Sequence, residues 1–229
     1  MKYLIVNGDD FGASRGVNRA IVESHRYGIL TSTSLLVDVP WSESAAILSR
    51  ALPGLSVGLH VDLSRVGTEA VAGRADTCRG ELHRQFDRFR TLMGRPPTHL
   101  DSHHNVHRDP RLLPHFVDLA ERHDLPLREH SPVRYYSGFY GQWGGETHLE
   151  QISVDGLRRI LDAEVHEGVT ELGCHPGYVD PDLRSGYAIE RETEVRTLCH
   201  PAVPQLLAER QIRLVGFRDL RALAADSVA

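Results

Sequence analysis

Short runs of apolar residues alternate along this chain with segments in which apolar residues recur at helical spacing. Residues 3–7 form the first such run, which ends abruptly at two adjacent carboxylates, Asp9 and Asp10. A near-continuous apolar run of this length is typical of a strand that is buried on both faces of a parallel sheet. The pattern therefore predicts that charge has been placed at the carboxyl end of a core strand.

The same reading along the rest of the chain predicts seven strands that alternate with helices. Strands are expected at residues 3–7, 32–39, 55–63, 98–102, 125–128, 170–174 and 212–215. Helices are expected at residues 14–27, 41–52, 80–93, 110–123, 154–166, 190–210 and 217–225, with long loops at 64–79 and 129–151. This alternation predicts an α/β fold, an irregular (β/α) barrel of about seven parallel strands, with an open doubly wound sheet as the alternative.

Size and charge narrow the class of protein. At 229 residues and 25.6 kDa the chain suits a single domain spanning residues 1–229. A net charge of −5 and a pI near 6.3 argue against a nucleic-acid surface. No apolar run approaches the ~18 residues that a membrane span needs, and three cysteines without a pairing pattern suit free thiols. We expect a cytoplasmic protein whose partner is a small molecule.

Polar residues of catalytic type follow four of the predicted strands. They are the Asp9–Asp10 pair, His60, the cluster from Asp101 to His107, and His175. Each has a simpler interpretation when taken alone, because a lone histidine in an apolar strand is often a core residue and HHNVH could be a solvated turn. The carboxyl ends of parallel strands, however, meet on one face of the sheet. Their joint placement predicts a functional site on that face.

The residue types favour a metal-dependent hydrolytic site. Two adjacent carboxylates repel each other, so a cation is expected beside them. One carboxylate and two histidines, with positions left open, form a recurring site for one divalent ion, for which ligand type suits Zn²⁺ or another transition ion. Such an ion lowers the pKa of water and polarises a carbonyl oxygen. A second carboxylate can accept the proton of that water, and a further histidine can protonate the leaving group.

Five motifs together resemble the YdjC-like (ChbG/HpnK) carbohydrate deacetylases. They are GDDFG at residues 8–12, TSTSLLV at 31–37, VGLHVDL at 57–63, THLDSHHNVH at 98–107 and CHPGYVD at 174–180, and they occur in the order that the family has. The resemblance implies a barrel similar to that of polysaccharide (NodB-like) deacetylases. It also implies metal-dependent removal of the N-acetyl group from an amino sugar, with Mg²⁺ as the ion commonly described.

The resemblance also implies roles for individual residues. Asp10 is expected to bind the metal ion together with His60 and His103. Asp9 is expected to act as the general base, and His175 of the HPG motif as the general acid.

Six further residues are candidates for supporting the site or for contacting substrate. Asp101 can orient a ligand imidazole, as metal-bound histidines commonly require. His104 or His107 could replace His103 as ligand, since adjacent residues of an extended chain point to opposite faces. Arg128 could pair with Asp9 or lie on the surface.

Aromatic side chains of the 129–151 loop, among them Tyr136 and Trp143, could form a platform for a sugar ring. Plain loop packing or a contact in a homodimer is the alternative for these aromatics. The segment after Leu63 looks shorter than in longer family members, which leaves open the size of the sugar that is accepted.

Other functions on a similar barrel remain open from sequence. A second enzyme class is a metal-dependent sugar isomerase or a hydrolase of phosphate esters on a similar barrel. A non-catalytic sugar-binding protein would need the metal ligands but neither a base nor an acid, so Asp9 and His175 argue against it. A small N-acetylated sugar or glycoconjugate is therefore the expected partner.

Overall fold

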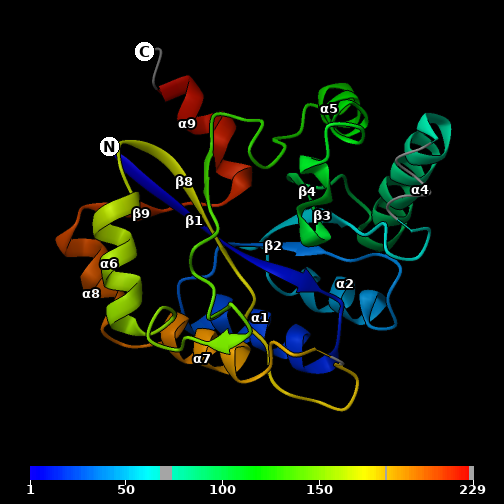
Figure 1. The fold of residues 1–229 in the computed structure, drawn as a ribbon. Helices are drawn as coiled ribbons and strands as arrows, with labels where there is room; N and C mark the ends of the chain where they lie inside the picture. The colour runs from blue at the N-terminus through cyan, green and yellow to red at the C-terminus, as the bar shows by residue number, and fades with distance from the viewer. Residues whose placement is uncertain (68–73, 184, 227–229) are drawn as a thin grey trace.

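The computed structural model describes residues 1–67, 74–183 and 185–226, and its centre is a curled, parallel sheet (Figure 1). Seven strands belong to this sheet: β1 (Lys2–Phe11), β2 (Ser32–Leu35), β3 (Ser56–Val61), β4 (Leu100–Ser102), β5 (Arg134–Tyr136), β8 (Gly168–Cys174) and β9 (Ile212–Leu214). A separate antiparallel hairpin pairs β6 (Gln142–Trp143) with β7 (Glu146–Thr147). The predicted parallel α/β architecture is confirmed.

The strand order is β4-β3-β2-β1-β8-β5, with β1 at the centre. Residues Lys2 to Leu4 of β1 pair with β9, whereas β2 pairs with β1 only from Asn7 onward, so β9 and β2 follow one another along the same edge of β1. The sheet curls into a half-barrel whose path ends at β4 and β5. Between these ends, Leu127 makes one parallel bridge to Leu100.

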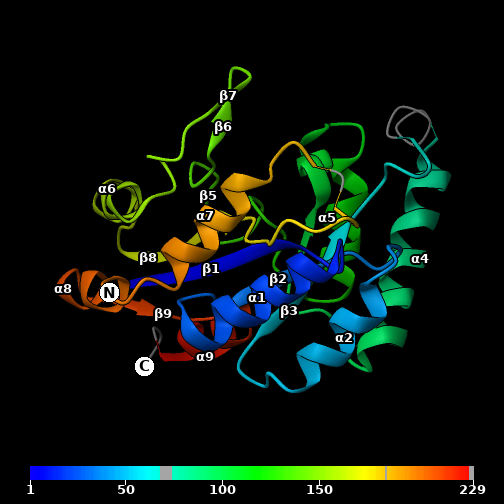
Figure 2. The same cartoon turned by 90° about the horizontal axis from the view of Figure 1, so that it is seen from below.

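Helices form the outer layer of the half-barrel (Figures 1 and 2). They are α1 (Arg15–Tyr27), α2 (Ser42–Arg50), α4 (Ala75–Met93), α5 (Leu113–Arg122), α6 (Val154–Glu164), α7 (Ile189–Leu198), α8 (Val203–Glu209) and α9 (Leu220–Asp226). The Ser14 hydroxyl accepts a hydrogen bond from the amide of Val17 and thereby caps α1, as its position before the apolar stripe predicts. Among the described residues, no helix is long and apolar enough to cross a membrane.

Three predicted elements are wrong. Residues 125–128 form a bridge instead of a fifth strand, because Pro126 has no amide proton for a ladder; β5 lies further on at Arg134–Tyr136. The predicted helix 190–210 is divided into α7 and α8 around Pro201, which cannot continue a helix. Helix α4 begins at Ala75 instead of residue 80, and residues 68–73 of the predicted 64–79 loop lie outside the described residues.

The inside of the half-barrel brings the backbone of β3 into close contact with a buried histidine. The His99 ring stacks on Phe217 with centroids 3.9 Å apart, and its nitrogens contact Ser34 at 3.3 Å and Thr98 at 2.9 Å. Residue 58 must be glycine here, because a Cβ at Gly58 would lie 2.4 Å from the His99 ring. Burial lowers the pKa of His99 to about 4, so the ring packs as a neutral group at neutral pH.

We expect Gly58→Ala to lower the free energy of unfolding by about 1–3 kcal/mol, because the new methyl group displaces the His99 ring from a packed interior. Urea denaturation measures this change. Gly80→Ala is the matched control: it adds a methyl to α4 with nothing within 4 Å and should be neutral or stabilise the protein by up to about 1 kcal/mol. Equal effects of the two substitutions would contradict the packing described for His99.

Candidate functional site

The carboxyl end of β1 departs from regular strand geometry at the two aspartates. Its register against β2 shifts between Gly8 and Phe11, and Asp10 has a φ of 68°, a conformation that non-glycine residues rarely adopt. Consecutive residues of a regular strand point to opposite faces. The irregularity removes this alternation, and both Asp9 and Asp10 are buried with His60 on the same side of the sheet.

Asp10 lies next to two histidines that come from different strand ends. Its Oδ1 is 3.5 Å from Nε2 of His60, on β3, and 3.1 Å from Nδ1 of His103, directly after β4. One ligand atom from each of the three residues lies within 4.8 Å of the others, and Asp10 Oδ1 is buried without a hydrogen-bond partner among the described residues. A carboxylate oxygen and two imidazole nitrogens converging in this way could hold a divalent metal ion.

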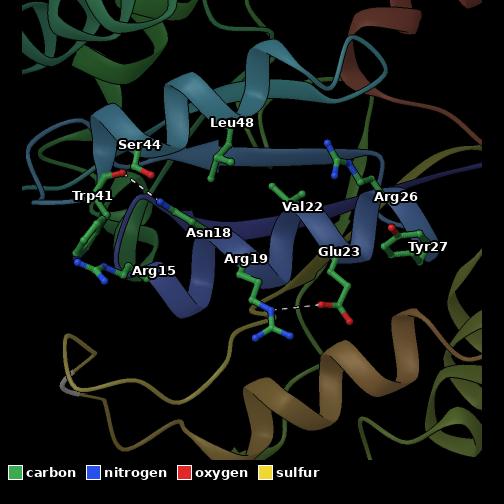
Figure 3. A pocket seen from close by; sticks show the side chains of 10 residues that line it. All are labelled: Arg15, Asn18, Arg19, Val22, Glu23, Arg26, Tyr27, Trp41, Ser44 and Leu48. Atoms are coloured by element: carbon green, nitrogen blue, oxygen red, sulfur yellow. Dashed lines mark hydrogen bonds and ion pairs between the residues drawn. The ribbon is translucent and has the colours of Figure 1, made fainter.

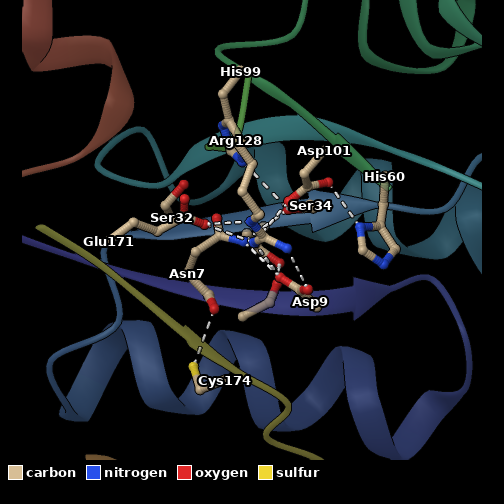
Figure 4. A network of polar contacts seen from close by, with 12 residues as sticks. Asn7, Asp9, Ser32, Ser34, His60, His99, Asp101, Arg128, Glu171 and Cys174 are labelled. Carbon is tan, nitrogen blue, oxygen red and sulfur yellow. Dashed lines mark hydrogen bonds and ion pairs between the residues drawn. The ribbon is translucent and has the colours of Figure 1, made fainter. Parts of the chain in front are cut away.

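Asp101, on β4, fixes the orientation of His60. Nδ1 of His60 lies 2.7 Å from Asp101 Oδ1 (Figure 4). This contact leaves Nε2 of His60 directed at Asp10. The Ser34 hydroxyl donates to the other Asp101 oxygen at 2.5 Å. Burial alone would lower the pKa of His60, but the charge of Asp101, its hydrogen bond to His60 and the nearby Asp10 carboxylate raise it to about 10. Asp101 thus occupies the position expected of a residue that orients a ligand imidazole.

Arg128 lies at the centre of the buried polar network drawn in Figure 4. Its Nη1 and Nη2 each donate to one oxygen of Asp9 at 2.8 Å, and Nη2 also lies 2.6 Å from Glu171 and 2.9 Å from Asp101. Burial opposes ionisation of Asp9, but the charge and hydrogen bonds of Arg128 bring the pKa of Asp9 below its ordinary value. Burial raises the pKa of Glu171 to about 7, and Arg128 limits that rise.

A second trio, Asp9, His60 and Asp101, also brings ligand atoms within 4.8 Å of one another. Arg128 donates to both oxygens of Asp9 and contacts Asp101, so its guanidinium already supplies the positive charge that these carboxylates need. The Asp10, His60 and His103 trio is therefore the better candidate for a metal ion.

His175, directly after β8, lies close to Asp9. Its Nε2 is 3.9 Å from Asp9 Oδ2, and its Nδ1 is buried without a hydrogen-bond partner. Burial lowers the pKa of His175 to about 4, so the imidazole is neutral at neutral pH. Tyr140 and Tyr187 stack on each other at 4.3 Å, and each meets the His175 ring edge-on at 5.6 Å and 6.0 Å.

Four further predicted residues are not members of the Asp10 trio. His104 has a φ of 56° and stacks on His103 with centroids 3.9 Å apart. His107 is buried, 2.6 Å from the Ser102 hydroxyl and 3.4 Å from Glu129. Tyr136 is half-buried in β5, whereas Trp143 is exposed on the β6–β7 hairpin and stacks on His148 at 3.6 Å. Of the three histidines after β4, only His103 reaches Asp10 and His60 in the trio that could hold a metal ion.

Three buried charged residues of the site were missed from sequence. Arg191 donates to Asp10 Oδ2 at 2.6 Å, Glu171 binds Arg128, and Glu194 accepts hydrogen bonds from the His175 amide and from the Tyr187 hydroxyl. Arg191 and Glu194 belong to α7, where Glu190, Arg191 and Glu194 are all buried. One sequence signal could have pointed to these residues. The segment that forms α7 has no apolar stripe, which a helix packed on a core normally shows, so charged residues of α7 must face the interior.

Two hollows lie outside this cluster. A groove of about 440 Å³ runs over the outer surface between α1 and α2, and none of the predicted site residues lines it (Figure 3). A second hollow of about 660 Å³ lies at the carboxyl ends of β2 and β3, where Asp38, Asp62, Ser64 and Arg65 contribute to its lining. Asp62 follows His60 by two residues, so the second hollow borders the candidate site.

Comparisons with known proteins agree with the motifs. Residues 3–209 match the model of the YdjC-like protein family. A chitooligosaccharide deacetylase from Serratia marcescens is 35% identical over 258 residues, which cover 96% of this chain and 99% of that protein. The aligned stretch of 258 residues exceeds the 229 residues of this chain, so the relative carries insertions that this chain lacks.

Solved structures agree with the fold. A protein of Enterococcus faecalis V583, provisionally named for cellobiose-phosphate cleavage, is 28% identical with a TM-score of 0.76, covering 96% of this chain and 98% of that one. The peptidoglycan deacetylase PdaC from Bacillus subtilis has a TM-score of 0.55 at 15% identity, with coverage of 100% and 94%. At 15% identity the second likeness concerns the fold alone, and it confirms the predicted deacetylase-type barrel.

We expect Arg128→Met to lower the free energy of unfolding by about 3–5 kcal/mol, because Asp9, Asp101 and Glu171 would be left buried without their shared cation. Arg108→Met is the control, since Arg108 pairs with Glu129 but its side chain is 49% exposed, and this substitution should cost less than about 1 kcal/mol. Chemical denaturation of both variants decides the matter. A cost for Arg128→Met no larger than that of the control would show that Arg128 does not hold the network together.

Proposed function

The chain belongs to the YdjC-like protein family, and on that premise we propose that it is a metal-dependent carbohydrate deacetylase. The reaction is hydrolysis of the N-acetyl group of an amino sugar or glycoconjugate, which releases acetate and a free amine. The observation that carries this proposal is the convergence of Asp10, His60 and His103 beside a separate, ionised Asp9. The name of the Serratia relative supports the substrate class.

Asp10, His60 and His103 would hold one divalent ion, for which the ligand types suit Zn²⁺ and the family resemblance suggests Mg²⁺. A divalent ion in such a site lowers the pKa of a water molecule toward about 7 and polarises a carbonyl oxygen. The buried, unpartnered Oδ1 of Asp10 supports this assignment, because a buried carboxylate oxygen normally has a partner.

Asp9 is the proposed general base. A carboxylate offers about two acceptor positions on each oxygen. Oδ1 of Asp9 accepts from Arg128 and from the side-chain Nδ2 of Asn7, both at 2.8 Å. Among the described residues, Oδ2 accepts a hydrogen bond from Arg128 alone. Oδ2 is also the oxygen that faces His175. Asp9 can therefore take the proton of the attacking water at Oδ2 while Arg128 keeps the carboxylate in place.

His175 is the proposed general acid, although its imidazole is neutral at neutral pH. Because the pKa of His175 is about 4, the imidazole first needs a proton, and Asp9 Oδ2 lies 3.9 Å from its Nε2. We propose that the proton taken from water by Asp9 passes to His175 and then to the departing nitrogen as the C–N bond breaks. One water is consumed, and acetate and the amine are the products.

The rest of the sugar is proposed to extend over the rim of the site. Tyr140 is the aromatic of the 129–151 segment that touches His175, so it is better placed for a sugar ring than Trp143 on the hairpin. The hollow at the carboxyl ends of β2 and β3, with Asp62 and Ser64 in its lining, offers hydrogen-bonding groups for a second sugar. A short chitin-type oligosaccharide suits this arrangement.

Acetate release from a panel of N-acetylated sugars tests the proposed function. We expect release from a chitin-type disaccharide, loss of this release in the presence of a chelator, and recovery when a divalent ion is added back. A sugar isomerase would change the sugar without releasing acetate, and a sugar-binding protein would bind it without any turnover. Either result, or undiminished acetate release after verified removal of the metal, would refute the proposal.

Single substitutions should separate the proposed roles. Asp9→Asn and His175→Gln should each lower kcat by about 10²–10⁴-fold while bound metal stays near one ion per chain. Asp10→Asn should lose the metal ion as well as activity, because it removes a ligand charge. His166→Ala changes an exposed histidine and should keep wild-type turnover. Metal analysis beside steady-state kinetics checks these outcomes, and Asp9→Asn with wild-type turnover would exclude Asp9 as the base.

A further inference from the structure

Arg191 contacts the candidate metal ligand Asp10 from a helix that the sequence motifs do not include. Its side chain is 8% exposed, and its Nη2 donates to Asp10 Oδ2 at 2.6 Å. The two oxygens of Asp10 therefore have different surroundings. Oδ2 is held by Arg191, whereas Oδ1 faces His60 and His103 and has no hydrogen-bond partner in the part of the chain that the structure describes.

The same arginine also joins Asp10 to the turn after β8. Nη1 of Arg191 donates to the His175 carbonyl at 3.3 Å, and the Gly177 amide donates to the Arg191 carbonyl at 3.3 Å. The aliphatic part of Arg191 packs against the backbone of Gly177, where an added Cβ would lie 3.0 Å from Cδ of the arginine. Arg191 is thus in contact with both the DDFG turn and the HPG turn.

The charge of Arg191 also stabilises the ionised form of Asp10. Burial opposes ionisation of Asp10, yet the charge of Arg191, followed by the two imidazoles, holds the pKa of Asp10 well below its ordinary value. This charge and the hydrogen bond from Nη2 together keep Oδ2 of Asp10 occupied by Arg191.

We propose that Arg191 is a positioning residue that restricts Asp10 to coordinating the metal ion through Oδ1 alone. A carboxylate can bind an ion through one oxygen or through both. With Oδ2 held by Arg191, the ion receives one oxygen and two imidazole nitrogens, and its other positions stay open for water and for the acetamide oxygen. This inference rests on the proposed metal site and goes beyond it by explaining why the site stays open.

The test compares Arg191→Met with Arg191→Lys, using Co²⁺ as the probe ion. We expect Arg191→Met to weaken Co²⁺ affinity about 10–100-fold, because partners of ligating groups typically contribute that much. The visible d–d bands of bound Co²⁺ should also weaken and shift, since the freed Asp10 can add its second oxygen and raise the coordination number. Lysine can still donate one hydrogen bond to Oδ2, so Arg191→Lys should retain the wild-type spectrum.

Arg196→Met is the matched control, because Arg196 lies on the same helix with its side chain 63% exposed and should leave affinity and spectrum unchanged. A wild-type Co²⁺ spectrum in folded Arg191→Met, with affinity equal to or tighter than wild type, would overturn the proposal. Should Arg191→Met not fold, Arg191→Gln serves as the uncharged variant under the same criteria. Failure of the wild-type protein to bind any divalent ion would instead refute the proposed metal-dependent function, so the two failures are distinguishable.

Discussion

The contact of Arg128 with three carboxylates is the interaction on which the rest of the site depends. Taking an ion out of water costs several kcal/mol even after the protein relaxes, so Asp9, Asp101 and Glu171 can be buried together only around a cation. Arg128 is that cation, and its side chain is 1% exposed. The Arg128 guanidinium holds Asp9 and contacts Asp101. Asp101 in turn orients His60 toward Asp10. A chain of ion pairs and one hydrogen bond thus leads from Arg128 through Asp101 and His60 to Asp10.

The two adjacent aspartates each have an arginine of their own. Arg128 binds Asp9 with two hydrogen bonds, and Arg191 binds Asp10 with one, so the mutual repulsion of the carboxylates is offset from two sides of the barrel. The left-handed backbone at Asp10 makes this division possible, since it points both side chains into the interior. Besides its arginine contacts, each carboxylate has one oxygen that faces a second group of the site. Asp9 Oδ2 faces His175, and Asp10 Oδ1 faces the two imidazoles.

Features that depend on apolar strand patterns or on local motifs could be predicted from the sequence. Apolar runs predicted β1, β3, β8 and β9, and the polar residues at strand ends predicted that Asp10, His60 and His103 lie near one another, as they do in the structure. Local pattern could not locate β5, because the pairing of Arg134–Tyr136 with β8 depends on residues more than thirty positions away. Arg191 was missed for the same reason, since α7 meets Asp10 only through the tertiary fold. The neutral state of His175 also follows from burial, which the sequence does not reveal.

The proposed function requires that one divalent ion binds between Asp10, His60 and His103 while Asp9 stays bound to Arg128. A crystal structure of the metal-loaded protein, with diffraction recorded at the absorption edge of a bound Zn²⁺ or Co²⁺ ion, tests it most directly. We expect one strong anomalous peak within bonding distance of Asp10 Oδ1, His60 Nε2 and His103 Nδ1, with the Asp9–Arg128 contacts intact. A peak centred on Asp9 and Asp101, or a fully loaded ion that does not touch His60 and His103, would contradict it.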